Sequence, residues 1–123
     1  MFGIFVNETG HIPYAVAIVS GFKPIETRNR NTLKSLVGKR VAIVRTHRNK
    51  KPMIFGYVTI SFCDFRSEKW LDNHRDLTLI PPGSMYDCKG KGKYCYYLSR
   101  PEKCEPYELP KNAVRHGFSY CEF

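Results

Sequence analysis

Three ionisable residues stand close together in the stretch Gly21–Arg28, namely Lys23, Glu26 and Arg28. In an extended backbone, side chains two residues apart point to the same side, so Glu26 and Arg28 share one face. A carboxylate can accept hydrogen bonds from the edge of a nucleobase, and a guanidinium can bind phosphate through two parallel hydrogen bonds. Lys23 can attract phosphate, or act as a general base if burial and Arg28 lower its pKa. The stretch therefore predicts a ligand-binding groove or, alternatively, a structural group of ion pairs.

The residues around this stretch predict the elements that hold it. Pro13 suits the first turn of a helix, and the mostly apolar residues 14–20 continue that helix. Gly21 is a suitable left-handed cap at its end. Residues 24–28 then predict a strand in which Ile25 faces the core while the charged face lines a groove.

The remainder of the chain predicts mostly short strands. Gly56 interrupts the longest of them, which indicates a bulge or the close approach of another segment. A polar turn at residues 47–52 joins two of the strands into an antiparallel hairpin. We expect strands at 3–6, 39–46, 53–63, 94–99, 104–109 and 118–123, helical turns at 32–37 and 67–71, and loops at 72–87 and 110–117.

This arrangement of elements favours a mainly β fold with short helices (α+β), built as a small mixed or antiparallel β-barrel. The 123 residues are enough for one hydrophobic core. We therefore expect a single domain that spans residues 1–123.

The net charge of +9 is concentrated in one third of the chain. Residues 21–51 contain ten Lys or Arg and one acid, Glu26, whereas the other residues carry equal numbers of both signs. A basic patch of this kind attracts polyanions, of which nucleic acid is the commonest. A solvated basic face, or a surface for an acidic protein partner, would have the same composition.

Further residues are candidates for contacts around the groove. Arg45, Thr46 and Arg48 follow one another near the end of a predicted strand, where we expect them to form a basic rim. Tyr57 is a candidate for stacking on a base, although most aromatic residues at strand spacing belong to the core. The lysine-glycine repeat at residues 89–93 either clamps a phosphate backbone or is simply solvated.

No motif for a metal or a cofactor is present, because the chain lacks a glycine-rich phosphate loop, an HExxH motif and a nucleophile elbow. We predict neither. The five cysteines include no Cys-x-x-Cys pair and are expected to be reduced thiols. A zinc site built from Cys88, Cys95, Cys104 and a histidine would have unusual ligand spacing. No apolar run approaches the roughly 20 residues of a membrane span, and no signal peptide is recognisable, so we expect a cytoplasmic protein without membrane contact.

Residues 21–28 match the pattern G-x-K-x-x-E-x-R, which resembles the signature of the ASCH domain, a member of the PUA-like superfamily of small β-barrels. The resemblance spans His11 to Phe118 and implies a PUA-like barrel whose groove is lined by the motif. The segments that agree with the family are the helix 13–20, the basic-then-aliphatic strand 38–44, the glycine-containing strand 55–58, the aromatic strand 96–98 and the pair Gly117–Phe118.

The resemblance implies that RNA or a related ligand binds in this groove. Some bacterial members of the family look like enzymes, one group cleaving RNA and another removing the acyl group from N4-acetylcytidine. In the second group the position of Glu26 holds a threonine that acts with the motif lysine and a distant glutamate. The glutamate here argues against transferring that activity, and Thr27 is expected to face the other way.

We therefore expect an RNA- or nucleotide-binding domain whose groove is lined by Lys23, Glu26 and Arg28. The alternative is a small metal-independent hydrolase that acts on RNA or on an acylated or modified nucleoside. In that enzyme Lys23 would be the base or electrostatic stabiliser and Glu26 its acid/base partner. A module that binds an acidic protein is a second alternative.

Overall fold

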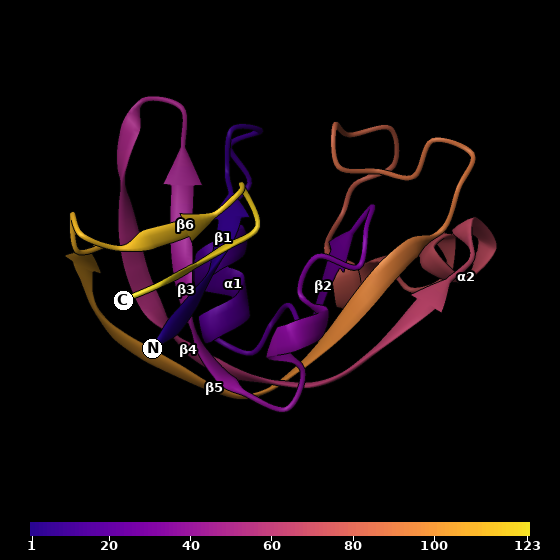
Figure 1. The fold of residues 1–123 in the computed structure, drawn as a ribbon. Helices are drawn as coiled ribbons and strands as arrows, with labels where there is room; N and C mark the ends of the chain where they lie inside the picture. Colours follow the sequence, from indigo (N-terminus) through magenta and orange to yellow (C-terminus); the bar gives the residue numbers. More distant parts are fainter.

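The computed structural model describes residues 1–123 and is dominated by β-strands (Figure 1). The strands are β1 (Phe2–Asn7), β2 (Ile25–Arg28), β3 (Arg40–His47), β4 (Lys50–Arg66), β5 (Lys93–Glu108), β6 (Val114–His116) and β7 (Tyr120–Glu122), and the helices are α1 (Tyr14–Val19), α2 (Glu68–Asp72) and α3 (Arg75–Thr78), with a 3₁₀ turn at Lys34–Leu36. All seven strands belong to one mixed sheet in the order β2-β5-β4-β3-β1-β7-β6. The predicted mainly β fold with short helices is confirmed.

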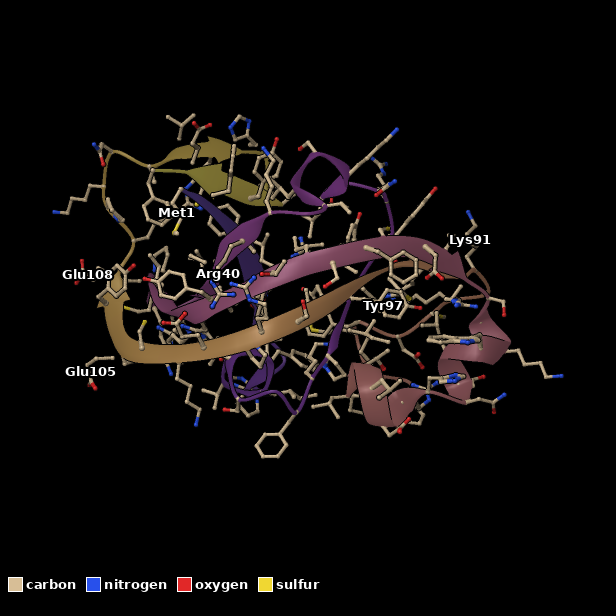
Figure 2. The ribbon with its side chains drawn as sticks, turned by 90° about the horizontal axis from the view of Figure 1, so that it is seen from below. Met1, Arg40, Lys91, Tyr97, Glu105 and Glu108 are labelled. Atoms are coloured by element: carbon tan, nitrogen blue, oxygen red, sulfur yellow. The ribbon has the colours of Figure 1, made fainter.

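The sheet is strongly curved, so that its two ends rise as two arms (Figure 1). The first arm carries β1, β6 and the hairpin of β3 with β4, and the second arm carries β2 and the far ends of β4 and β5. Strands β4 and β5 run along the bottom and join the arms, and seen from below they lie side by side with Arg40 and Tyr97 on this face (Figure 2). Their pairing shifts register three times between residues 54 and 62 of β4, and such bulges bend a strand.

Gly56 lies at one of these register shifts and permits a close approach of three elements. A Cβ atom built at this position would lie 2.1 Å from the carbonyl oxygen of Glu102 in β5 and 2.8 Å from Val19 Cγ1 in α1. Its φ angle of +154° is also one that other residues rarely adopt. The predicted bulge or close approach at Gly56 is therefore confirmed.

Helix α1 lies inside the curve of the sheet, between the two arms (Figure 1). Its buried residues, among them Ile18 and Val19, pack in a core cluster with residues of β1, β3, β4 and β5. Gly21 follows the helix with a φ angle of +84°, the left-handed cap that the sequence predicts. The backbone N–H groups of Phe22 and Lys23 both donate to the carbonyl of Ala17, which turns the chain sharply towards β2.

Two expected strands, at residues 94–99 and 104–109, prove to be parts of the single strand β5. Between these two segments Arg100 has a φ angle of +52° and the register with β4 shifts, but the strand continues. Strand β4 likewise extends beyond the expected 53–63 at both ends, to 50–66.

The two segments expected as loops also contain regular structure. Helix α3 lies within residues 72–87, where Arg75 donates hydrogen bonds to the carbonyl of Ile80 at 2.8 Å and to Asp87 Oδ1 at 3.1 Å. Strand β6 lies within residues 110–117 and pairs with β7. Both elements are short and are held by contacts with residues outside them. None of the helices has the length and apolarity needed to cross a bilayer.

Candidate functional site

A cavity of about 1020 Å³ opens between the two arms of the sheet. The first arm contributes residues of β1, the end of β3, Arg115 and Phe118, and the second arm contributes β2 and residues from the segment 80–93. Helix α1 contributes Tyr14. The cavity therefore brings together parts of the chain that are far apart in sequence, because the curved strands β4 and β5 place the two arms opposite each other.

Lys23 is buried in the cavity wall, with 2% of its surface exposed. Its Nζ donates hydrogen bonds to the carbonyl of Ile25 at 2.8 Å and to the carbonyl of Thr78 in α3. The same atom lies 3.7 Å from Glu26 Oε1 and 5.0 Å from the centre of the Tyr14 ring. Desolvation lowers the pKa of Lys23 to about 8, although the Glu26 carboxylate opposes the shift.

Arg28 connects the two arms. Its Nη2 donates to the carbonyl of Phe5 in β1 at 2.5 Å and to Glu26 Oε2 at 3.2 Å. Glu26, which is only 9% exposed, thus has a cation on each side. Because a buried carboxylate is costly without such partners, Lys23 and Arg28 stabilise Glu26 in the cavity wall.

The basic residues of the cavity fall into two groups. Eight Lys or Arg line it, against two acids, Glu26 and Asp87. Lys23, Arg28 and Lys93 donate hydrogen bonds to protein oxygen atoms, Lys93 to the carbonyl of Tyr86. The other five are exposed and make no side-chain hydrogen bond or ion pair within the protein, and we call them the rim: Arg30, Arg48, Lys89, Lys91 and Arg115.

Not all of the residues singled out in the sequence lie at this cavity. Lys23, Glu26, Arg28, Thr46 and Arg48 line it, and so does Thr27, which we expected to face away.

Arg45 and Tyr57 do not line the cavity. Arg45 donates to the carbonyl of Lys51 at 3.2 Å, and its guanidinium lies 5.2 Å from the centre of the Phe55 ring. The hydroxyl of Tyr57 is 2.6 Å from that of Tyr107 on β5. Arg45 precedes Thr46 by one residue in β3, and the period of two along a strand separates their side chains.

Several residues of the cavity have no strong signal in the sequence. The sequence predicts Tyr14 only as part of the helix at residues 14–20, and Arg115 lies in a segment expected as a loop. Phe118 lines the cavity with 96% of its surface exposed. In the sequence it is marked only by the pair Gly117–Phe118, which agrees with the ASCH family.

The cysteines are all free thiols. Cys88 lines the cavity and Cys95 is buried beside it, whereas Cys104 packs in a different cluster with residues of β1 and β3. Desolvation raises the pKa of the Cys88 thiol. No three His, Cys, Asp or Glu residues are close enough to hold a metal ion.

Structures of an ASCH protein from Zymomonas mobilis are similar to this one. The unsubstituted protein matches with a TM-score of 0.64 at 18% identity, covering 87% of this chain and 73% of that one. A serine-to-alanine variant matches with a TM-score of 0.67 at 21% identity, and a tyrosine-to-phenylalanine variant with 0.63 at 20%; each covers 87% of this chain, and they are covered over 74% and 76% of their own lengths. No protein-family model and no curated protein matches the sequence. The chain therefore has the fold of the ASCH domain.

Proposed function

We propose that this protein binds RNA or a nucleotide in the cavity between the two arms. The observation that carries the proposal is the rim, since its five cations are exposed and have no acceptor within the protein. Such exposed cationic donors bind phosphate groups, and RNA presents a continuous chain of phosphates. The rim draws on both arms, so a bound strand would lie across the opening of the cavity.

The motif residues have a different role in this proposal. The Lys23 amine donates to the carbonyls of Ile25 and Thr78, and Nη2 of Arg28 donates to the carbonyl of Phe5. Both cations also pair with Glu26, so these two residues hold the cavity wall together. Phe118 at the opening offers an exposed ring on which a base could stack. Phosphate contacts are thus assigned to the rim rather than to the motif.

Titration of a fluorescently labelled single-stranded RNA at several salt concentrations tests the proposal. Each phosphate contact contributes about −0.7 to the slope of log K against log salt, so we expect a slope of roughly −3 to −4 if the whole rim is used. A polyglutamate of equal charge is the control, and we expect it to bind much more weakly. Absence of RNA binding at low salt would contradict the proposal, and equal binding of polyglutamate would favour an acidic protein partner.

A second candidate function, hydrolysis of RNA or of an acylated nucleoside, is favoured by one observation. Burial lowers the pKa of Lys23 to about 8, and its amine lies 3.7 Å from Glu26, an arrangement that could activate a water molecule. Purified protein would be incubated with RNA and with acylated cytidines beside a Lys23→Ala variant. We expect an enzyme to release product only with the unsubstituted protein, so equal product in both samples would contradict this function.

A further inference from the structure

The hydroxyl of Tyr14 is a buried polar group without a partner. Tyr14 is 4% exposed and lines the cavity, yet its hydroxyl makes no hydrogen bond to the protein. Leaving such a group unpaired costs about 1 to 3 kcal/mol, and buried hydroxyls in proteins are rarely left so. The ring is held from two sides, by Lys23 Nζ at 5.0 Å from its centre and by Tyr86, edge-on, at 5.7 Å. The hydroxyl is thus held in a fixed position.

Glu26 supplies a complementary group in the same wall. Its Oε2 accepts from Arg28, but Oε1 accepts no hydrogen bond and has only the ion pair with Lys23 at 3.7 Å. Desolvation, helped by the charge of Glu26, raises the pKa of Tyr14 to about 12, so the phenol stays protonated near neutral pH. The inner wall therefore offers one hydroxyl that can donate and one carboxylate oxygen that can accept.

A phosphate does not fit this inner wall. The Glu26 carboxyl group competes with it for the two cations, the Lys23 amine already donates to two carbonyls, and Nη2 of Arg28 already donates to the carbonyl of Phe5. A neutral planar group with a hydrogen-bond donor beside an acceptor fits better, and the pairing edge of every nucleobase has that arrangement.

We propose that Tyr14 and Glu26 read the hydrogen-bonding edge of a single nucleobase, so that a nucleotide enters base first and leaves its phosphates at the rim. This inference rests on the proposed nucleotide-binding function and adds its recognition residue and the orientation of the ligand. Sequence-specific contacts to single-stranded RNA commonly involve such splayed-out bases.

Tyr14→Phe removes only the hydroxyl, and Tyr120→Phe, which lies outside the cavity, is the matched control. Calorimetric titration would use the four nucleoside 5′-monophosphates and ribose 5-phosphate, which carries the phosphate without a base. We expect at least one nucleoside monophosphate to bind more tightly than ribose 5-phosphate. Tyr14→Phe should lower the affinity for that nucleotide about tenfold, the effect of one lost hydrogen bond. It should leave the affinity for ribose 5-phosphate unchanged. Tyr120→Phe should change neither.

The possible results separate the two proposals. If Tyr14→Phe leaves nucleotide affinity unchanged, or if ribose 5-phosphate binds as tightly as every nucleotide, the base is not read by Tyr14, while RNA binding at the rim still stands. If the unsubstituted protein binds neither RNA nor any nucleotide, both proposals fail. Because the hydroxyl has no partner in the protein, Tyr14→Phe should unfold at the same or a higher temperature. A marked loss of stability would mean that the hydroxyl is bonded internally, and would overturn the inference.

Discussion

A Lys23→Met variant should lose about 2 kcal/mol of its free energy of unfolding at pH 7. Methionine fills a similar volume, but the carbonyls of Ile25 and Thr78 lose their buried donor, and Glu26 retains only Arg28 as a partner. Urea unfolding in reducing buffer, followed by the fluorescence of the single tryptophan, measures the loss. Lys34→Met is the control, since Lys34 is exposed and unpaired, and it should change stability by less than about 0.5 kcal/mol.

The difference in the free energy of unfolding between the unsubstituted protein and Lys23→Met should depend on pH. Folding lowers the pKa of Lys23 from 10.5 to about 8, so between these values the unfolded chain binds more protons than the folded one. The free energy of unfolding contributed by Lys23 therefore rises from pH 8 to pH 10.5, by up to about 3 kcal/mol. The advantage of the unsubstituted protein over Lys23→Met should grow across this range. If the free energies of unfolding of the two proteins changed with pH in parallel, the Lys23 amine would not be buried in the way described.

An Arg48→Glu/Lys91→Glu double variant should bind single-stranded RNA about 100-fold more weakly at moderate salt, a loss of about 3 kcal/mol. Arg48 follows β3 in the first arm and Lys91 precedes β5 in the second, so the change affects both sides of the opening. The slope of log K against log salt should also become shallower by about 0.7 for each lost contact. Anisotropy titrations at four salt concentrations measure both quantities.

Lys34→Glu/Lys69→Glu is the matched control for this experiment, because it changes the net charge by the same amount at exposed positions outside the cavity. It should weaken binding by only a few-fold, through the smaller overall attraction. An equal loss of RNA affinity in both double variants would mean that binding depends on net charge alone. The cavity would then have no special role in binding.

The cations of the cavity fall into two groups, those that bond to the protein and those of the rim. Arg28 joins β2 to β1, and Lys23 joins β2 to α3, so the motif acts as a brace between segments that do not pair in the sheet. These contacts hold the wall of the cavity in place. The rim residues are exposed and make no hydrogen bond or ion pair with the protein, and only the Arg115 guanidinium lies over an aromatic ring, 4.9 Å from the centre of Phe5. Their donors are therefore available for the proposed phosphate contacts.

Short-range patterns were sufficient to predict the local structure around the motif. A helix that ends at Gly21, followed by a strand with Ile25 in the core, depends on residues only a few positions apart. The spacing of Glu26 and Arg28 similarly predicts their common side, and both line the cavity. The mainly β class also follows from local composition and periodicity, because strand and turn preferences act over a few residues.

The make-up of the cavity depended instead on contacts between distant segments. One partner of Arg28 is 23 residues away, and one partner of Lys23 is 55 residues away. The sequence concentrates the net charge in residues 21–51, but three of the five rim cations come from residues 89–115, and Arg45 lies elsewhere. These positions follow from the curvature of β4 and β5, which depends on bulges and on the approach of Gly56 to Glu102. No pattern of neighbouring residues encodes that curvature. The sequence of residues 21–28 therefore predicts a charged site. The tertiary structure determines that Lys23 and Arg28 hold the wall of this site together and that other residues surround its opening.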